Sequence, residues 1–150
     1  MRKSSLIIGS IILVMIFVSN LYSSEKLNTL KVLRGWSPVA EFKVEAANTD
    51  KERARGLMFR KKLTKDRGMW FIFHEDENNP FWMKDTYISL DIIFVDNNTN
   101  IVSISENAQP MSIKPIYSQS KYRYVLEVPA GTVKKYGIKL KDRCRFQTVY

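Results

Sequence analysis

Apolar and polar residues follow strand-like patterns along most of the chain. Val39–Val44 and Tyr122–Val128 alternate with a period of two, which is typical of half-buried β-strands. Gly68–Phe73 is a continuous apolar run of strand length, and the stretch RCRFQTV (143–149) alternates again near the end of the chain. Four β-strands are therefore predicted from these stretches alone.

A β-hairpin and a helical turn are predicted between these strands. Leu90–Asp96 and Ile101–Glu106 flank NNTN, a tip of turn-forming residues. PAGTVKKYGI favours a short helix between Pro129 and Gly137. Because short strands and turn signals outnumber helical patterns, the predicted class is mainly β, either a compact β-sandwich or a partly closed barrel with one or two short helices.

A second short helix is predicted after Thr49. Thr49 and Glu52 have the spacing of a capping box, in which the hydroxyl accepts a backbone N–H and the carboxylate reaches back to the start. Ala54, Leu57 and Met58 follow at helical spacing, so we expect one face of this helix to pack inward.

The N-terminal residues indicate a targeting segment. Arg2 and Lys3 precede the uncharged apolar run Leu6–Val18, and small residues follow up to Ser24, as in a secretory signal peptide. The run is short for the roughly 20 apolar residues of a membrane-spanning helix. Removal of the segment is favoured, with retention as an N-terminal membrane anchor as the alternative. We expect an exported protein, periplasmic or extracellular, with the segment at 1–24, a linker at 25–37 and a β domain at 38–150.

The net charge adds no specific partner. The chain has 24 Lys and Arg against 15 Asp and Glu, which gives a formal net charge of +9. The cations are spread along the chain, and the densest cluster, Lys51–Leu63, contains an acid and an apolar stripe. No nucleic-acid-binding motif accompanies it. We therefore predict an ordinary basic surface and no nucleic-acid partner.

One histidine and one cysteine leave few metal or nucleophilic centres. A zinc site draws three or four ligands from His, Cys and carboxylates, whereas the acids that follow His74 are adjacent in a predicted turn and point in different directions. No nucleophile motif accompanies His74 as a base. Cys144 stands in an alternating strand and is expected to be a small buried side chain. We predict no metal site and no cofactor.

Three carboxylates stand within or beside apolar strand candidates, where a charge is costly unless it is paired. They are Asp85, Asp91 and Glu127. In one interpretation they form a half-buried salt-bridge network that fixes the sheet. In the other they line a pocket, with Asp91 or Glu127 as an acid/base carboxylate, as in glycoside hydrolysis. The available cations are Arg55, Arg60 and Lys84.

The segment FWMKDT, Phe81–Thr86, combines aromatic and charged residues. If it is a strand, its side chains alternate between two faces. One face carries Phe81, Met83 and Asp85, and the other carries Trp82, Lys84 and Thr86. Trp82 beside Lys84 suits a flat apolar or sugar-like ligand. The alternative is that Phe81 and Met83 are core residues and Trp82 lies over the sheet as a lid.

Several stretches resemble one known family in the same order along the chain. They are RGLMFRKKL (55–63), GMWFIF (68–73), FWMKDTYISLDIIFVD (81–96), IVSI (101–104), YVLEVPAG (124–131) and YGIKLKDRC (136–144). Together they are similar to the domain-of-unknown-function 192 family. The resemblance implies a compact, mainly β domain, often exported, with no established activity or cofactor. Asp85 departs from the asparagine usual in the motif.

Three functions remain open from the sequence. The first is an exported, non-enzymatic binding or accessory module for a small-molecule or glycan-like ligand. The second is a small hydrolase acting on an envelope polymer or glycan, with Asp91 or Glu127 as its acid/base group. The third is a structural protein tethered by its N-terminal anchor. The candidate ligand-binding residues are Arg55, Arg60, Trp82, Lys84, Asp85 and Thr86.

Overall fold

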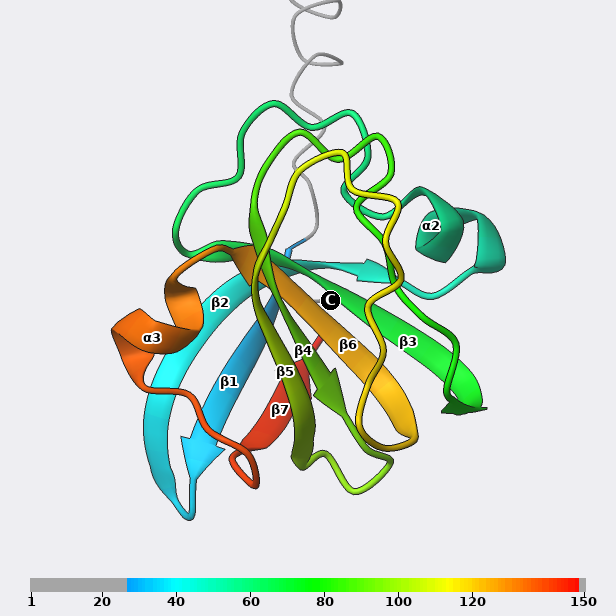
Figure 1. Ribbon diagram of the computed structural model, residues 1–150. Coiled ribbons are helices and arrows are strands. Elements are labelled where there is room, and N and C mark those ends of the chain that lie inside the picture. The colour runs from blue at the N-terminus through cyan, green and yellow to red at the C-terminus, as the bar shows by residue number, and fades with distance from the viewer. Residues whose placement is uncertain (1–26, 149–150) are drawn as a thin grey trace, which may run out of the picture.

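The computed structural model describes residues 27–148, so the predicted targeting segment lies outside the described residues. In this range the chain forms one sheet of seven strands in the order β5-β4-β6-β3-β2-β1-β7 (Figure 1). The strands are β1 (Asn28–Arg34), β2 (Ser37–Ala47), β3 (Arg67–Glu77), β4 (Leu90–Val95), β5 (Ile101–Ala108), β6 (Tyr122–Pro129) and β7 (Arg143–Gln147). Two short helices join them, α2 (Asp50–Arg55) and α3 (Thr132–Tyr136).

The sheet curls into a half-barrel, because its two edge strands meet at one end. A bridge pairs Asn100 with Arg143. The N–H of Cys144 donates to the carbonyl of Thr99 at 2.8 Å, and the N–H of Ile101 donates to the carbonyl of Asp142 at 2.8 Å. Of the two predicted alternatives, the partly closed barrel is therefore confirmed.

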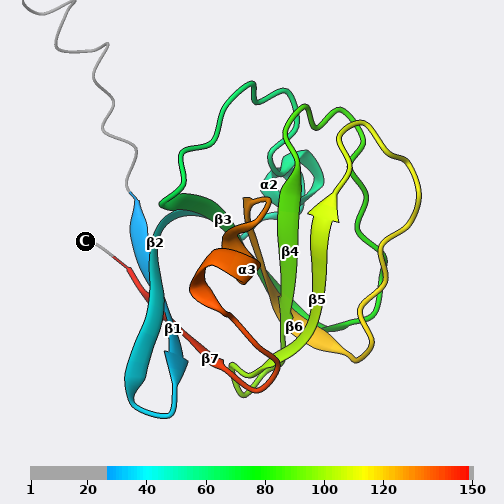
Figure 2. The same cartoon turned by 60° about the vertical axis from the view of Figure 1, so that its left-hand side comes forward.

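The inside of the curl carries the first hydrophobic core. Alternate residues of the strands point inward, among them Val32, Phe42 and Trp70. Helix α3 lies against this face and contributes Val133 and, just after its end, Ile138 (Figure 2). The predicted helical turn is therefore confirmed, and it packs against part of the interior of the half-barrel.

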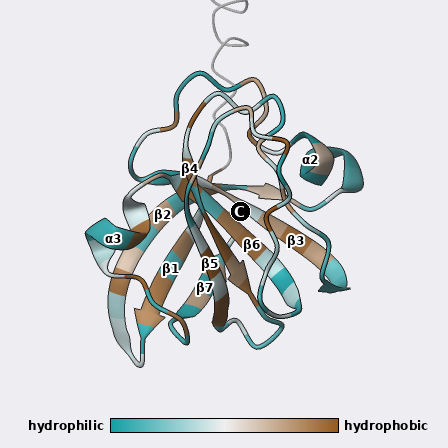
Figure 3. Ribbon diagram, viewed as in Figure 1, coloured by the Kyte–Doolittle hydropathy of each residue, from teal (hydrophilic) through white to brown (hydrophobic). Residues whose placement is uncertain are grey.

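The outer face of β3, β4 and β6 carries a second core beneath irregular segments. Phe71, Phe94 and Val125 belong to this core, together with Leu57, which follows α2. The loops that surround this face are mixed in hydropathy, while the strands carry the brown apolar residues (Figure 3). Because both faces of the central strands are covered, β4 is buried along its whole length.

The hairpin, the strands and the capping box are confirmed, and three local predictions are wrong. The predicted linker at 25–37 contains β1, whose residues pair with both β2 and β7. The acidic stretch after Phe73 is not a turn, because β3 continues to Glu77, which pairs with Tyr122. Helix α2 buries none of its own residues, and Ala54 is exposed.

The segment Phe81–Thr86 is not a sheet strand. It runs beside the long loop that precedes β6, where Phe81 and Ile116 exchange hydrogen bonds of 2.9 and 2.8 Å. Phe81 and Met83 still point into the outer core, as expected, while Trp82 lies outward. The alternation ends at Asp85, whose φ of 52° turns the chain.

Candidate functional site

A pocket of about 170 Å³ lies on the outer face of the sheet, between the end of α2 and the segment around Phe81. We call it the α2 pocket. Its walls are mainly aromatic and aliphatic, with a few polar groups. Its lining residues are Arg53, Ala54, Arg55, Gly56, Leu57, Met58, Phe71, Phe73, Asn79, Pro80, Phe81, Trp82, Thr86, Tyr122 and Glu127.

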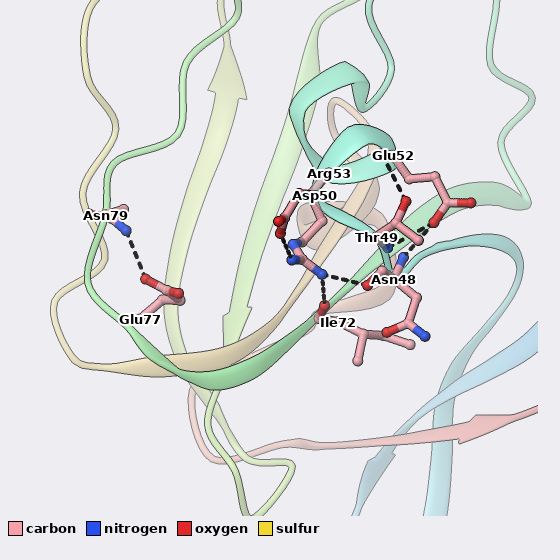
Figure 4. A network of polar contacts seen from close by, with 8 residues as sticks. All are labelled: Asn48, Thr49, Asp50, Glu52, Arg53, Ile72, Glu77 and Asn79. Carbon is pink, nitrogen blue, oxygen red and sulfur yellow. Dashed lines mark hydrogen bonds and ion pairs between the residues drawn. The ribbon is translucent and has the colours of Figure 1, made fainter.

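The capping network of α2 holds one wall of this pocket. The Thr49 hydroxyl accepts the Glu52 N–H, and the Glu52 carboxylate accepts the Thr49 N–H at 2.9 Å. Arg53 ties the helix to the sheet by donating to the carbonyls of Asn48 at 2.6 Å and of Ile72 at 2.7 Å (Figure 4). Its guanidinium also lies 5.1 Å from the centre of the Phe73 ring. A helix of six residues is thus fixed by its polar contacts rather than by burial.

Phe81 is the centre of an aromatic cluster that forms the opposite wall. Its ring meets those of Phe71, Phe94 and Tyr122 edge-on, at centroid distances of 5.5, 5.6 and 6.1 Å. The Tyr122 hydroxyl donates to the Asn79 carbonyl at 2.9 Å. Edge-to-face packing of this kind is stabilising and rigid. The wall of the pocket is therefore largely preformed.

Glu127 supplies the buried polar group of the pocket. It lies on β6 opposite Met69 of β3 and Ile92 of β4, and it is 5% exposed. No ion pair or hydrogen bond joins its carboxyl group to any residue between 27 and 148. Burial alone raises the pKa of Glu127 to about 8. The group is therefore largely protonated and neutral at neutral pH, so that it can both donate and accept a hydrogen bond.

A glycine allows the two strands beside Glu127 to approach closely. A Cβ atom on Gly68 would lie 2.6 Å from the Glu127 carbonyl oxygen, which is a severe clash. The pairing of β3 with β6 at this point thus requires glycine. It sets the position of the β6 backbone at the base of the pocket.

Asp91, the other predicted acid/base carboxylate, lies on the opposite face of the sheet and is fully buried. Its two oxygens accept the N–H groups of Asn107 and Val133, each at 2.9 Å. It is therefore a structural group that joins the start of α3 to the end of β5. The interpretation in which both carboxylates line one pocket is wrong, because Asp91 adjoins Ile92, the residue that pairs with Glu127, and successive residues along a strand point to opposite faces.

The predicted salt-bridge network is also wrong. Neither Asp85, Asp91 nor Glu127 pairs with a cation of the described chain. The ion pair that does hold a buried carboxylate joins Arg34 and Asp142, neither of which stood out in the sequence. Arg34 donates to both oxygens of Asp142, at 2.9 and 2.8 Å.

Three of the six predicted ligand-binding residues lie at the α2 pocket. Arg55 and Thr86 line it, and Trp82 does so with 52% of its side chain exposed. The sequence also suggested no role for Tyr122 or Phe73, which complete the aromatic wall. The sequence placed both residues in or at the end of predicted strands, but it did not predict which segment would cover them.

The other three residues lie elsewhere. Arg60 pairs with Glu45 beside β2, and Lys84 is exposed outside the α2 pocket. Asp85 adopts a left-handed conformation, and its carbonyl accepts the Phe59 N–H at 2.7 Å. Asn and Asp both tolerate this conformation. The departure from the family's asparagine is therefore explained by the backbone.

No metal centre is formed by the part of the chain that the structure covers, since no three His, Cys, Asp or Glu side chains converge there. His74 is exposed on β3, where its carbonyl accepts a hydrogen bond from Arg123 at 2.8 Å. Cys144 is buried as expected, and burial raises the pKa of its thiol to about 12. No helix among residues 27–148 is long and apolar enough to cross a membrane.

Comparison with known proteins gives a family and two related folds. The model of the DUF192 family, described as "Uncharacterized ACR", matches residues 32–146. A crystal structure of a "putative transcription regulator" from Sinorhizobium meliloti is similar, with a TM-score of 0.77 and 35% identity over 82% of this chain and 95% of that one. A protein of unknown function from Novosphingobium aromaticivorans gives a TM-score of 0.77 and 33% identity, over 83% and 88%. No curated protein matches the chain.

Proposed function

We propose a function from the α2 pocket itself, because this chain belongs to the DUF192 family, which is uncharacterized. The protein acts as a non-enzymatic binding module that holds one ring of a small aromatic or sugar-like molecule in this pocket. The observation that carries the proposal is Glu127, a buried carboxyl group without a partner in the described chain, which lines an aromatic pocket.

The size and walls of the pocket support a ligand of one ring. Its volume is about 170 Å³, and an apolar cavity of about 150 Å³ holds one benzene molecule. Phe81 and Tyr122 supply apolar contact, and the exposed Trp82 supplies a flat surface at the rim. Small-molecule sites commonly combine such walls with a small number of polar groups.

The polar groups support a ligand with hydrogen-bonding substituents. A neutral Glu127 both donates and accepts, which suits a hydroxyl or an amide. Arg55 lines the same pocket and is exposed, and its guanidinium forms no ion pair or hydrogen bond with another described residue. Its guanidinium is available to an acceptor on the outer end of the ligand. A ligand of this kind would give the Glu127 carboxyl group a hydrogen-bond partner that the described chain does not supply.

Thermal-shift measurements on the full-length protein test this proposal. The probes are phenol, benzamide, glucose and N-acetylglucosamine at millimolar concentration. At least one probe is expected to raise the melting temperature of the wild-type protein. Because a ligand stabilises only the state that binds it, the shift should vanish in Trp82→Ala and decrease in Glu127→Gln.

Trp36→Ala is the matched control, because Trp36 is also exposed but lies away from the α2 pocket. The shift should persist in this variant. Shifts that survive both Trp82→Ala and Glu127→Gln would contradict the proposal. The absence of a shift with all four probes would contradict it as well.

A hydrolase that uses Glu127 as its acid group is the second candidate. The raised pKa of Glu127 inside a pocket is what a general acid requires. However, Glu127 is the only carboxylate among the lining residues given above, so the two-carboxylate mechanism of glycosidases has no second group here. Turnover of a bound ring compound that is lost in Glu127→Gln, with its binding retained, would favour this candidate over the first.

Export and membrane tethering stay proposals from the sequence. Both depend on Met1–Ser24, which lies outside the described residues. A binding module in the periplasm or outside the cell agrees with the signal-peptide layout of this segment. The tethered structural role requires no ligand, so it also predicts that the probes above have no effect.

A further inference from the structure

The second hollow of the molecule lies on the inner face of the half-barrel. It measures about 780 Å³ and is lined by residues of β3, β6 and β7 and of the turns after β1 and β4. We call it the barrel-mouth cavity. It is separate from the α2 pocket because neighbouring residues of β3 point to opposite faces: Trp70 lines the cavity and Phe71 lines the pocket. Its lining residues are Leu33, Gly35, Trp36, Trp70, Ile72, Thr99, Tyr124, Arg143, Cys144, Arg145 and Phe146.

Stacked aromatic rings form one wall of this cavity. The rings of Tyr124 and Trp70 are nearly parallel, 5.2 Å apart and 10° inclined. Phe146 stacks on Trp70 as well, at 6.1 Å and 20°. Trp36 stands at the rim, in the turn between β1 and β2, with 92% of its side chain exposed. Flat rings held in parallel are a surface on which another planar ring can lie.

Two arginines of the edge strand β7 stand at the rim of the cavity, where they alternate with Cys144 and Phe146 and so project from the other face of this strand. Arg143 and Arg145 are both exposed, and neither forms an ion pair with a carboxylate in the described part of the chain. Arg143 makes two long contacts of 3.5 Å, to the Asn98 carbonyl and the Thr99 hydroxyl. No acidic residue stands among the lining residues given above. The charge is thus available to an anion from outside.

We propose that the barrel-mouth cavity is a second ligand site, for a planar aromatic anion. Its ring system stacks beside Tyr124 and Phe146, which lie on the buried Trp70 ring, and Trp36 covers it at the rim. Its acidic group pairs with Arg143 and Arg145, whose planar guanidinium groups suit carboxylate, sulfonate or phosphate oxygens. The volume of about 780 Å³ admits a ligand of several fused or linked rings. The proposal does not depend on a ligand in the α2 pocket.

Titration of the full-length protein with 8-anilinonaphthalene-1-sulfonate tests this site, since this dye is an anion with a planar naphthalene ring system and fluoresces when bound. The wild-type protein should bind it with a defined Kd. Arg145→Gln and Trp36→Ala should each raise the Kd about tenfold, the equivalent of about 1.4 kcal/mol. N-Phenyl-1-naphthylamine has the same rings without the sulfonate and should bind at least about tenfold more weakly, because it forms no charge-assisted contact.

Tyr117→Ala is the control for dye bound elsewhere, because Tyr117 is an exposed aromatic residue that lines neither of the two pockets. It should leave the Kd unchanged, and any background from the N-terminal apolar run is the same in every variant. Arg145 and Trp36 are exposed, so unchanged melting temperatures will show that their variants fold. A Kd that is unchanged in both Arg145→Gln and Trp36→Ala, or equal for dye and uncharged analogue, would overturn the proposal.

Discussion

At the scale of single residues, Asp91 and Glu127 have similar sequence surroundings but different roles in the fold. Each is an acid inside an apolar strand. Asp91 faces the interior and accepts two backbone N–H groups, so its charge is compensated. Glu127 faces the outer core, where no donor of the described chain reaches it. A polar group is expensive to bury unless it is hydrogen-bonded, which makes Glu127 the exceptional residue.

The pH dependence of stability should reveal the buried state of Glu127. Its native pKa of about 8 lies above the unfolded value of about 4.3. The native state therefore binds the proton more tightly than the unfolded state. The contribution of Glu127 to the free energy of unfolding is fully present below about pH 4.3 and is lost as the pH rises through about 8. The loss is at most about 5 kcal/mol. Urea unfolding at pH 5 and pH 8.5 measures it.

Glu127→Gln should flatten this pH dependence, because glutamine does not titrate. Glu106→Gln changes an exposed acid and should leave the dependence as it is in the wild-type protein. An equally steep fall in Glu127→Gln would mean that another group is responsible.

At the scale of elements, α2 illustrates how a marginal helix becomes part of a site. Six residues are too few for an isolated helix to be stable. Its capping box and the bonds of Arg53 to the sheet hold it in place. The chain then turns at Gly56, with φ 47° and ψ −135°, and Leu57 enters the outer core. The amphipathic face that the sequence suggested is thus completed beyond the helix.

Gly56→Ala should disturb this turn more than a comparable change elsewhere. An alanine at this φ is strained, and its Cβ would lie 3.2 Å from the Phe71 ring. We expect a loss of about 2–4 kcal/mol in the free energy of unfolding, measured in urea. Gly35→Ala is the control, because its φ is also positive at 60° but nothing lies within 4 Å. It should cost about 1–2 kcal/mol. Equal losses would show that Phe71 is not a constraint.

At the scale of the whole molecule, the half-barrel depends on contacts that join the two ends of the sheet. Arg34 at the end of β1 donates to Asp142 and to the Gly137 carbonyl, at 2.7 Å for the latter. Burial opposes ionisation of Asp142, but the hydrogen bonds from Arg34 and from the Lys139 N–H prevail and lower its pKa. These bonds hold the loop before β7, which in turn bridges to the β4–β5 hairpin. One buried carboxylate thereby connects distant parts of the chain.

Asp142→Asn should weaken this closure by about 1–3 kcal/mol, since Arg34 is partly exposed and solvent reduces the effect. The lowered pKa of Asp142 means that its contribution is present above the unfolded pKa of about 3.9 and is lost as the pH falls below it. The difference between wild type and variant should therefore shrink at low pH. Asp76→Asn removes an exposed partner of Arg123 and should cost at most about 1 kcal/mol. A larger loss there than at Asp142 would contradict the closure.

The sequence by itself determined the local structure and the family. Alternation, turn residues and the capping box predict most strands and both short helices, because these signals act between residues that are close in the chain. They also predict that Phe81 and Met83 are core residues. The prediction of a linker for residues 28–34 was wrong, because this segment lacks the regular alternation of the other strands. It is a strand because it pairs with β2 on one side and with β7 on the other.

Only the tertiary structure decided which side chains meet. Three contacts join segments that are far apart in the sequence. Strand β1 pairs with β7, residues 81–86 cover the outer face of the sheet, and Arg34 pairs with Asp142. A shift of one position along a strand moves a carboxylate from the face that packs on a helix to the face that lines a pocket. This separates Asp91 from Glu127 and places Trp70 and Phe71 in different cavities. Composition alone carries no information about register, because the side-chain environment depends on the neighbouring strands.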